Sequence, residues 1–128
     1  MNSLKKILHV DDDEDIRTIA RYSLEQLGGF ELLQCTCVTE AIQKAKEFMP
    51  DLLLLDMQLP DGTGATILDD LCKVQSLAGI PAIFLTGENA TDVKGMAAHA
   101  QVAGFIQKPF DPISLPQEIR KSFQKHRC

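Results

Sequence analysis

The sequence lacks any apolar run that could cross a membrane. A spanning helix needs roughly 18 consecutive apolar residues, and the apolar runs of this chain are all much shorter. The apolar stretch near the N-terminus is brief and runs directly into acidic residues, unlike a secretory signal peptide. We therefore predict a cytoplasmic protein that does not bind membranes.

The chain also lacks an excess of basic residues. Its 13 Lys and Arg face 18 Asp and Glu, which gives a formal net charge of −5. Surfaces that bind nucleic acids carry clustered positive charge, so we predict that this protein binds no nucleic acid directly. A modest negative charge is instead typical of a soluble protein.

Paired cysteines are missing as well. The four cysteines form no C-x-x-C pair, and no histidine lies at zinc-finger spacing from them. Cys35 and Cys37 could face the same side of a strand, so a metal or disulfide is conceivable there. In a reducing compartment, two small core or half-buried side chains are the favoured interpretation.

Short apolar runs alternate with longer segments of helical periodicity. At 128 residues the chain is long enough for one domain with its own core. The expected strands are Lys5 to Val10, Phe30 to Thr36, Leu52 to Leu55, Ile80 to Leu85 and Ala103 to Gln107. Helices are expected near residues 16–27, 41–48, 67–74, 90–100 and 114–125. This alternation predicts an α/β fold whose parallel sheet is covered by helices on both faces.

The sequence near the C-terminus permits a more specific prediction about the last helix. Pro116 cannot lie deep inside a regular helix, and Ser114 with Gln117 has capping-box spacing. We expect the last helix to begin at about Ser114 and end near Lys125, with Pro112 in a looser turn before it.

Polar side chains stand at the ends of the expected strands. These residues are Asp11, Asp12, Asp56, Thr86 and Lys108. In a parallel sheet the carboxyl ends of the strands meet at one edge, which is where such folds bind ligands. Three carboxylates at one edge repel each other and favour a bound cation, and carboxylate oxygens suit Mg²⁺.

The same residues include the groups that phosphoryl transfer requires. Asp56, at the end of the central apolar strand, is the best candidate for a nucleophile. Lys108 adds a positive charge and Thr86 a hydroxyl, and both could hold phosphoryl oxygens.

The segments HVDDDED, LLLLDMQLPDGTG, FLTG and GFIQKPF, in this order and spacing, resemble the receiver domain of two-component response regulators. The resemblance extends from about Lys5 to Lys125, and we expect a chemotaxis-type, single-domain member. It implies a flavodoxin-like sheet with strand order 2-1-3-4-5, and one receiver domain over residues 1–128 with a core at about 5–125.

The resemblance also implies roles for the residues at the sheet edge. Asp56 is the expected phosphoacceptor. Asp12 is expected to bind Mg²⁺ directly and Asp11 partly through water, while Asp56 and the backbone carbonyl of Gln58 complete the ligands.

Further implied roles concern the switch. Thr86 and Lys108 are expected to contact the phosphoryl group, and Lys108 to pair with Asp56 beforehand. Phe105 is the expected aromatic switch residue, turning inward with Thr86, and Pro109 is expected to follow a cis peptide bond.

The implied partners are a histidine kinase or a histidine phosphotransfer domain as donor, and a downstream protein as receiver of the signal. The fourth helix, fifth strand and fifth helix form the expected readout surface. The protein is therefore expected to be a signalling domain that catalyses only its own phosphotransfer and dephosphorylation, not an enzyme with a separate substrate.

Three neighbouring residues have simpler interpretations. Asp13 is expected to open the first helix, where acidic side chains are favoured. Asp61 lies in a Pro-Asp-Gly segment and is expected to be a turn residue. His9 replaces the apolar residue usual in the family, and we expect it to be buried and neutral.

Three other functions are considered. Haloacid-dehalogenase phosphatases also form an aspartyl phosphate, but their second aspartate corresponds to Gln58 here. A receiver-like fold could instead bind proteins without phosphate, although all five polar positions are present. A flavodoxin-like cofactor carrier lacks support, because no Gly/Ser/Thr-rich phosphate loop follows the first strand.

Overall fold

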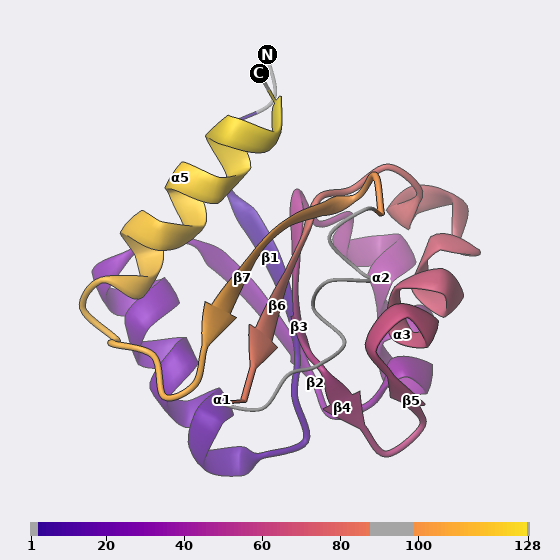
Figure 1. Cartoon of the computed structure of the whole chain (residues 1–128), viewed down its shortest axis with the longest axis horizontal. Helices are drawn as coiled ribbons and strands as arrows, with labels where there is room; N and C mark the ends of the chain where they lie inside the picture. The colour runs from indigo at the N-terminus through magenta and orange to yellow at the C-terminus, as the bar shows by residue number, and fades with distance from the viewer. Residues whose placement is uncertain (1–2, 88–98, 128) are drawn as a thin grey trace.

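A computed structural model describes residues 3–87 and 99–127. Its centre is a parallel sheet with the order β2-β1-β3-β6-β7, shown in Figure 1. The strands are β1 (Lys6–Val10), β2 (Glu31–Cys35), β3 (Leu52–Asp56), β6 (Ala82–Thr86) and β7 (Val102–Gln107). All five predicted strands are present within two residues of their expected ends, and the predicted strand order is confirmed.

Helices cover both faces of this sheet (Figure 1). Their bounds are α1 (Glu14–Arg21), α2 (Val38–Phe48), α3 (Gly64–Cys72) and α5 (Leu115–Arg127). α1 and α5 lie on one face, and α2 and α3 lie on the other. The helix expected at residues 90–100 lies almost wholly outside the described residues.

Strand β3 is buried on both of its faces, as its uninterrupted apolar run predicts. Leu53 and Leu55 pack into the core under α2 and α3, while Leu52 and Leu54 pack into the core under α5. Each of the four is fully buried, and a leucine contributes about 1.5–3 kcal/mol when it leaves water. The sheet edge that follows β3 therefore rests on a rigid strand.

The first helical segment changes its geometry midway. α1 ends at Arg21 and continues as a π-helix over Tyr22–Leu27, which the sequence analysis did not anticipate. Gly29 then adopts a φ of 73°, in the left-handed region where glycine is favoured. The predicted end of the segment at the glycine pair is confirmed.

The helices begin or end up to three residues from their predicted bounds. α3 ends at Cys72, so Val74 lies beyond it and leads into a 3₁₀ turn at Gln75–Leu77. α5 begins at Leu115 instead of Ser114 and ends at Arg127 instead of Lys125. The turn before α5 contains Pro112, as predicted, and the Ser114 hydroxyl donates to the Asp111 carbonyl oxygen.

A small hairpin follows β3 where we expected only a turn-rich loop. Strands β4 (Gln58–Leu59) and β5 (Gly62–Thr63) pair antiparallel. Between them, the Asp61 carboxylate accepts hydrogen bonds from the backbone N–H groups of Val38 and Thr39, at 2.8 and 3.0 Å. Asp61 therefore caps α2 from a distant loop, and its interpretation as a simple turn residue was incomplete.

The cysteines in the described residues are reduced. Cys35 is buried, and Cys37 and Cys72 are partly buried, which supports the interpretation as packing residues. Burial raises the pKa of the Cys35 thiol to about 11. Within residues 3–87 and 99–127, no helix is long and apolar enough to span a membrane.

Candidate functional site

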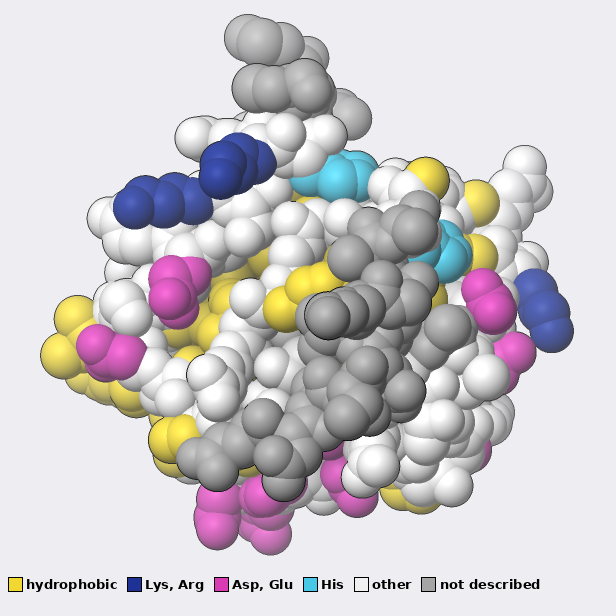
Figure 2. All heavy atoms as spheres, viewed as in Figure 1, with side chains coloured by type: hydrophobic (Ala, Val, Ile, Leu, Met, Phe, Trp, Pro, Cys, Tyr) yellow, Lys and Arg dark blue, Asp and Glu magenta, His cyan; other side chains and the backbone are white. Residues whose placement is uncertain are grey.

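The carboxyl ends of four neighbouring strands form one edge of the sheet. Asp11 follows β1, Asp56 ends β3, Thr86 ends β6, and Lys108 follows β7. Acidic side chains gather along the lower edge of the molecule in Figure 2, the edge toward which β6 and β7 point in Figure 1. The topology thus brings the predicted polar residues together.

Three carboxylates at this edge form a compact cluster. Asp11, Asp12 and Asp56 each offer an oxygen, and these oxygens lie within 4.8 Å of one another. Asp11 is fully buried, Asp12 is exposed and Asp56 is partly buried. Mg²⁺ prefers sites that offer few protein carboxylates and leave room for several bound waters. The residues present therefore fit such an ion.

Lys108, which follows β7, reaches into the cluster. Its Nζ lies 3.2 Å from Oδ2 of Asp11 and 3.2 Å from Oδ1 of Asp56. Its backbone N–H donates to the Thr86 carbonyl oxygen at 2.7 Å, and the peptide bond from Lys108 to Pro109 is cis. One cation therefore bridges two carboxylates that would otherwise repel each other.

The charges of the cluster shift its pKa values. Burial, together with the nearby Asp11 carboxylate, raises the pKa of Asp56, and Lys108 and the Gln58 N–H offset only part of this. Burial alone would lower the pKa of Lys108, but the carboxylates of Asp11 and Asp56 outweigh it and raise the pKa. At neutral pH Lys108 is therefore a firmly protonated cation.

Backbone and hydroxyl groups complete this edge. The N–H of Gln58 donates to Oδ1 of Asp56 at 3.4 Å. Thr86 is nearly buried at the end of β6. In β7, Phe105 pairs in register with Phe84, and their stacked rings lie 6.2 Å apart between centroids. Thr86, Phe105 and Lys108 thus belong to two adjacent strands.

Two residues behave as the sequence analysis expected. Asp13 is the N-cap of α1, and its carboxylate accepts from the N–H groups of Asp15 and Ile16. His9 is fully buried in β1, and burial, with the charges of Lys108 and Arg17, lowers its pKa to about 3. Arg17 was not predicted: its guanidinium donates to the Asp11 carbonyl oxygen at 2.8 Å, and no sequence signal indicates this contact.

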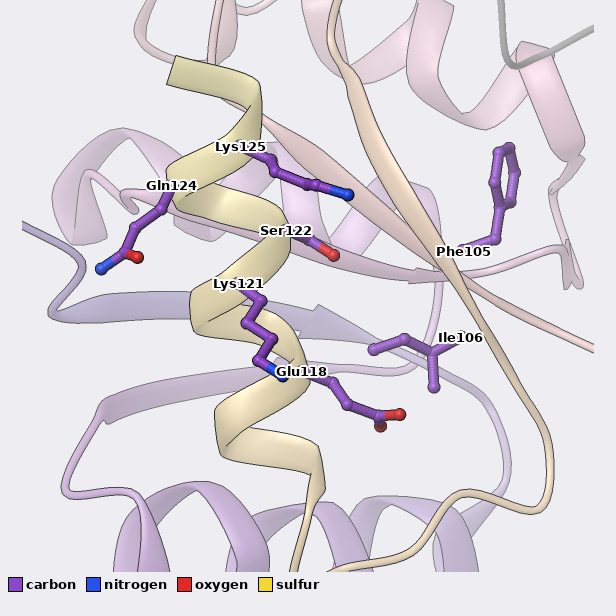
Figure 3. A pocket seen from close by; sticks show the side chains of 7 residues that line it. All are labelled: Phe105, Ile106, Glu118, Lys121, Ser122, Gln124 and Lys125. Carbon is purple, nitrogen blue, oxygen red and sulfur yellow. The ribbon is translucent and has the colours of Figure 1, made fainter. Parts of the chain in front are cut away.

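A groove of about 640 Å³ lies between β7 and α5, shown in Figure 3. It is lined by Phe105, Ile106, Glu118, Lys121, Ser122, Gln124 and Lys125. Ile106 points toward α5, whereas the Phe105 ring lies on the other side of β7 (Figure 3). The groove therefore lies on the α5 side of β7, and the Phe105 ring lies on the other side, where it stacks on Phe84.

The fold and site together define a class: a flavodoxin-like α/β domain with an acidic, lysine-bridged pocket at the carboxyl edge of its sheet. Comparison with known proteins makes this class specific. The protein family described as "Response regulator receiver domain" matches residues 7–120 of this chain. The chain belongs to the family of receiver domains of two-component response regulators.

Named relatives agree with this assignment. The chain is 34% identical over 118 residues to the phosphate regulon transcriptional regulatory protein PhoB of Escherichia coli (strain K12), covering 91% of this chain and 50% of that protein. It is also 34% identical over 116 residues to the alkaline phosphatase synthesis transcriptional regulatory protein PhoP of Bacillus subtilis (strain 168), covering 91% and 47%. The chain thus spans about half the length of these curated relatives.

A solved structure supports the fold over the whole domain. A CheY-like response regulator receiver domain protein from Methanospirillum hungatei JF-1 has a TM-score of 0.81 and 29% sequence identity, with 98% of each chain covered. Receiver domains are signalling modules and not classical enzymes, which agrees with the expectation of a signalling domain.

Proposed function

We propose that Asp56 is the phosphoacceptor of this receiver domain, with Mg²⁺ held by the neighbouring carboxylates. The observation that carries the proposal is the position of Lys108, whose Nζ is 3.2 Å from both Asp56 and Asp11. A lysine beside a partly buried carboxylate at a cation site supplies the charge neutralisation that phosphoryl transfer requires.

In the proposed reaction, an Asp56 oxygen attacks the phosphorus of a phosphohistidine on the donor protein. The new O–P bond forms as the P–N bond breaks, and the leaving imidazole nitrogen keeps the electron pair and takes up a proton. Lys108 neutralises a phosphoryl oxygen. A bound Mg²⁺ would supply further positive charge to the phosphoryl oxygens.

Exposure and pairing support the proposed ligand roles. Asp12 is exposed and is proposed as the direct ligand, while Asp11 is buried against Lys108 and is proposed to act partly through water. Asp56 and the backbone carbonyl of Gln58 are the remaining proposed ligands. The N–H of Gln58 already contacts Asp56, which supports placing its peptide group beside the site.

The proposed switch uses Thr86 and Phe105. Thr86 would follow the phosphoryl group and Phe105 would turn inward, favouring one of two states of the domain. Support comes from the adjacency of β6 and β7, which carry Thr86 and Phe105. The groove between β7 and α5 lies on the far side of β7 from the Phe105 ring (Figure 3). We propose that this groove belongs to the surface that a downstream protein partner reads.

The proposed donor is a histidine kinase or a histidine phosphotransfer domain in the cytoplasm. The receiver domain is proposed to have its core at about residues 5–125. The chemotaxis-type, single-domain assignment stays a prediction, because PhoB-type relatives extend beyond the matched region whereas the CheY-like structure does not.

The test is intact-protein mass spectrometry after incubation with acetyl phosphate or phosphoramidate, with and without Mg²⁺. We expect the added mass of one phosphoryl group, only with Mg²⁺, and none in Asp56→Asn. Asp61→Asn is the matched control, since it removes a nearby carboxylate that contacts α2 instead of the cluster, and it should still be phosphorylated.

The opposite outcome is equally informative. If the folded wild-type protein binds Mg²⁺ but gains no mass from either donor or from a phosphorylated histidine phosphotransfer domain, the phosphoacceptor proposal is wrong. A phosphate-independent binding module would then be the better interpretation. Steady turnover of a small phosphate ester would instead favour a hydrolase.

A further inference from the structure

A buried polar network lies behind the acidic cluster, on the α1 and α5 face of the sheet. His9 in β1 is in register with Gln34 in β2. Ile7, two residues earlier in β1, packs in the core of this face, and alternate strand residues share a face. His9 and Asp11 therefore project toward the same side of the sheet, and His9 lies directly behind Asp11.

Hydrogen bonding determines which imidazole nitrogen carries the proton. Nε2 of Gln34 donates to the Arg17 carbonyl oxygen at 2.8 Å and lies 3.1 Å from Nδ1 of His9. A carbonyl can only accept, so the Gln34 atom at this position is the amide nitrogen, and its second hydrogen faces Nδ1. Nδ1 therefore accepts, and the single proton of the neutral ring is on Nε2.

The protonated nitrogen faces the functional cluster. Nε2 of His9 lies 3.9 Å from Oδ2 of Asp11, and both atoms are buried without a hydrogen bond among the residues that the structure describes. Oδ1 of Asp11 already accepts from the N–H of Asp13 at 2.9 Å. Oδ2 of Asp11 therefore has two donor groups beside it: the ammonium of Lys108 at 3.2 Å and the neutral ring of His9.

These two donors differ in their freedom to move. The Lys108 side chain is 22% exposed and is shared with Asp56, whereas the His9 side chain is fully buried in a central strand. In the proposed reaction Lys108 turns to a phosphoryl oxygen on Asp56. Among the described protein groups beside Oδ2 of Asp11, His9 would then be the remaining donor, and a buried carboxylate oxygen without a protein donor is costly.

We propose that His9 is a positioning residue that holds the Asp11 carboxylate through Nε2–H, so that Asp11 keeps its place when Lys108 engages the phosphoryl group. This inference rests on the proposed phosphoacceptor function of Asp56. It assigns to this chain a contact from a strand position that the sequence analysis interpreted only as a buried, neutral side chain.

The first test is independent of phosphorylation. ¹⁵N NMR of the histidine rings in the whole wild-type chain, near neutral pH, reports which nitrogen carries the proton, and His9→Asn identifies the His9 signals by their loss. We expect an unprotonated Nδ1 and a protonated Nε2. A neutral ring with its proton on Nδ1 would overturn the proposal, because Nε2 would then have no hydrogen to donate to Asp11.

The second test compares two substitutions that differ in reach. Gln can place an amide nitrogen near the position of Nε2, whereas Asn can replace only the Nδ1 side of the ring. We expect His9→Asn to lower the phosphorylation rate at saturating phosphoramidate about three- to tenfold, the range of one neutral hydrogen bond. The half-saturating phosphoramidate concentration should not change, and His9→Gln should restore most of the rate.

Leu54→Val is the control for general damage to this part of the core. Leu54 is in register with His9 on β3 and makes no polar contact with the cluster, so its rate should equal that of the wild type. If the wild type is phosphorylated and His9→Asn and His9→Gln have the same rate, the His9 proposal is wrong. If the wild type is not phosphorylated, the proposed function fails first, and the role of His9 fails with it.

Discussion

Replacing Asp56 by Asn should stabilise this domain when no divalent cation is bound. The cluster holds three carboxylates, whose oxygens lie within 4.8 Å of one another, and one lysine ammonium that contacts two of them. Lys108 cannot neutralise all three carboxylates. In Asp56→Asn, Lys108 still pairs with Asp11, and the remaining excess of negative charge is smaller.

The size of the effect follows from the distances. The oxygens of Asp56, Asp11 and Asp12 lie no more than 4.8 Å apart. With an effective dielectric constant of about 20, a like-charge pair at this limit costs about 3.5 kcal/mol, and Asp56 forms two such pairs. The contact with Lys108 at 3.2 Å returns about 5 kcal/mol. About 2 kcal/mol of repulsion remains, and water weakens the part that comes from the exposed Asp12, so we expect a net stabilisation of about 1 kcal/mol in Asp56→Asn.

Urea unfolding followed by far-UV circular dichroism is the suitable assay, because the chain has no Trp and only one Tyr for fluorescence. Both proteins should be measured with a chelator at low salt, where surface charges are least screened. Asp69→Asn is the control: it also removes one negative charge, but from a side chain that is 63% exposed and lies outside the cluster. Its stability should change by less than about 0.5 kcal/mol.

The pH dependence has a definite sign. The folded state raises the pKa of Asp56, so ionisation of this carboxyl costs stability at pH values above its folded pKa. The advantage of Asp56→Asn should therefore be largest near neutral pH and shrink as the pH falls through the folded pKa toward the ordinary value of 3.8.

Added Mg²⁺ should reduce the difference in stability between Asp56→Asn and the wild type. A cation that binds only the folded state stabilises it, and the wild type has one more carboxylate to offer than the variant. The reasoning is refuted if Asp56→Asn is less stable than the wild type in chelator, or if Mg²⁺ stabilises both proteins equally.

Two further predictions concern packing around the site. Asp61→Ala should lower stability by about 1 kcal/mol, because its carboxylate caps α2, and Asp61→Asn should lose less. Burial alone would raise the pKa of Asp61, but hydrogen bonds from Thr39 and Val38 lower it, so the loss should disappear as the pH falls through the folded pKa. Phe105→Ala should cost about 1–2 kcal/mol, because a partly buried ring stacked on Phe84 is lost. Urea unfolding checks each variant, and wild-type stability in either would contradict the corresponding contact.

The sequence was enough to predict which residues form the candidate site and at which edge of the sheet they lie. Asp11, Asp56, Thr86 and Lys108 each follow or end an apolar run, and the edge rule for parallel sheets places such residues together. Local signals sufficed for the cap at Asp13 and for the helix end at Gly29, because capping and left-handed backbone geometry depend on only a few neighbouring residues.

Other features could not be obtained in this way. The π-helix over Tyr22–Leu27 replaces a helical pattern that looks regular in sequence, so the choice between the two geometries depends on packing against the rest of the domain. The capping of α2 by Asp61 joins residues that lie 23 positions apart in the chain. No local propensity encodes such a contact.

The sequence by itself determined the alternation of strands and helices, the buried central strand and the kinds of side chain at the sheet edge, because apolar periodicity and turn residues act over short stretches of chain. Only the tertiary structure decided that Lys108 bridges Asp11 and Asp56, and that Nε2 of His9 lies 3.9 Å from Oδ2 of Asp11. These contacts depend on which strands are neighbours and on their register. Distances of a few ångströms between residues far apart in the chain exist only after the sheet has formed.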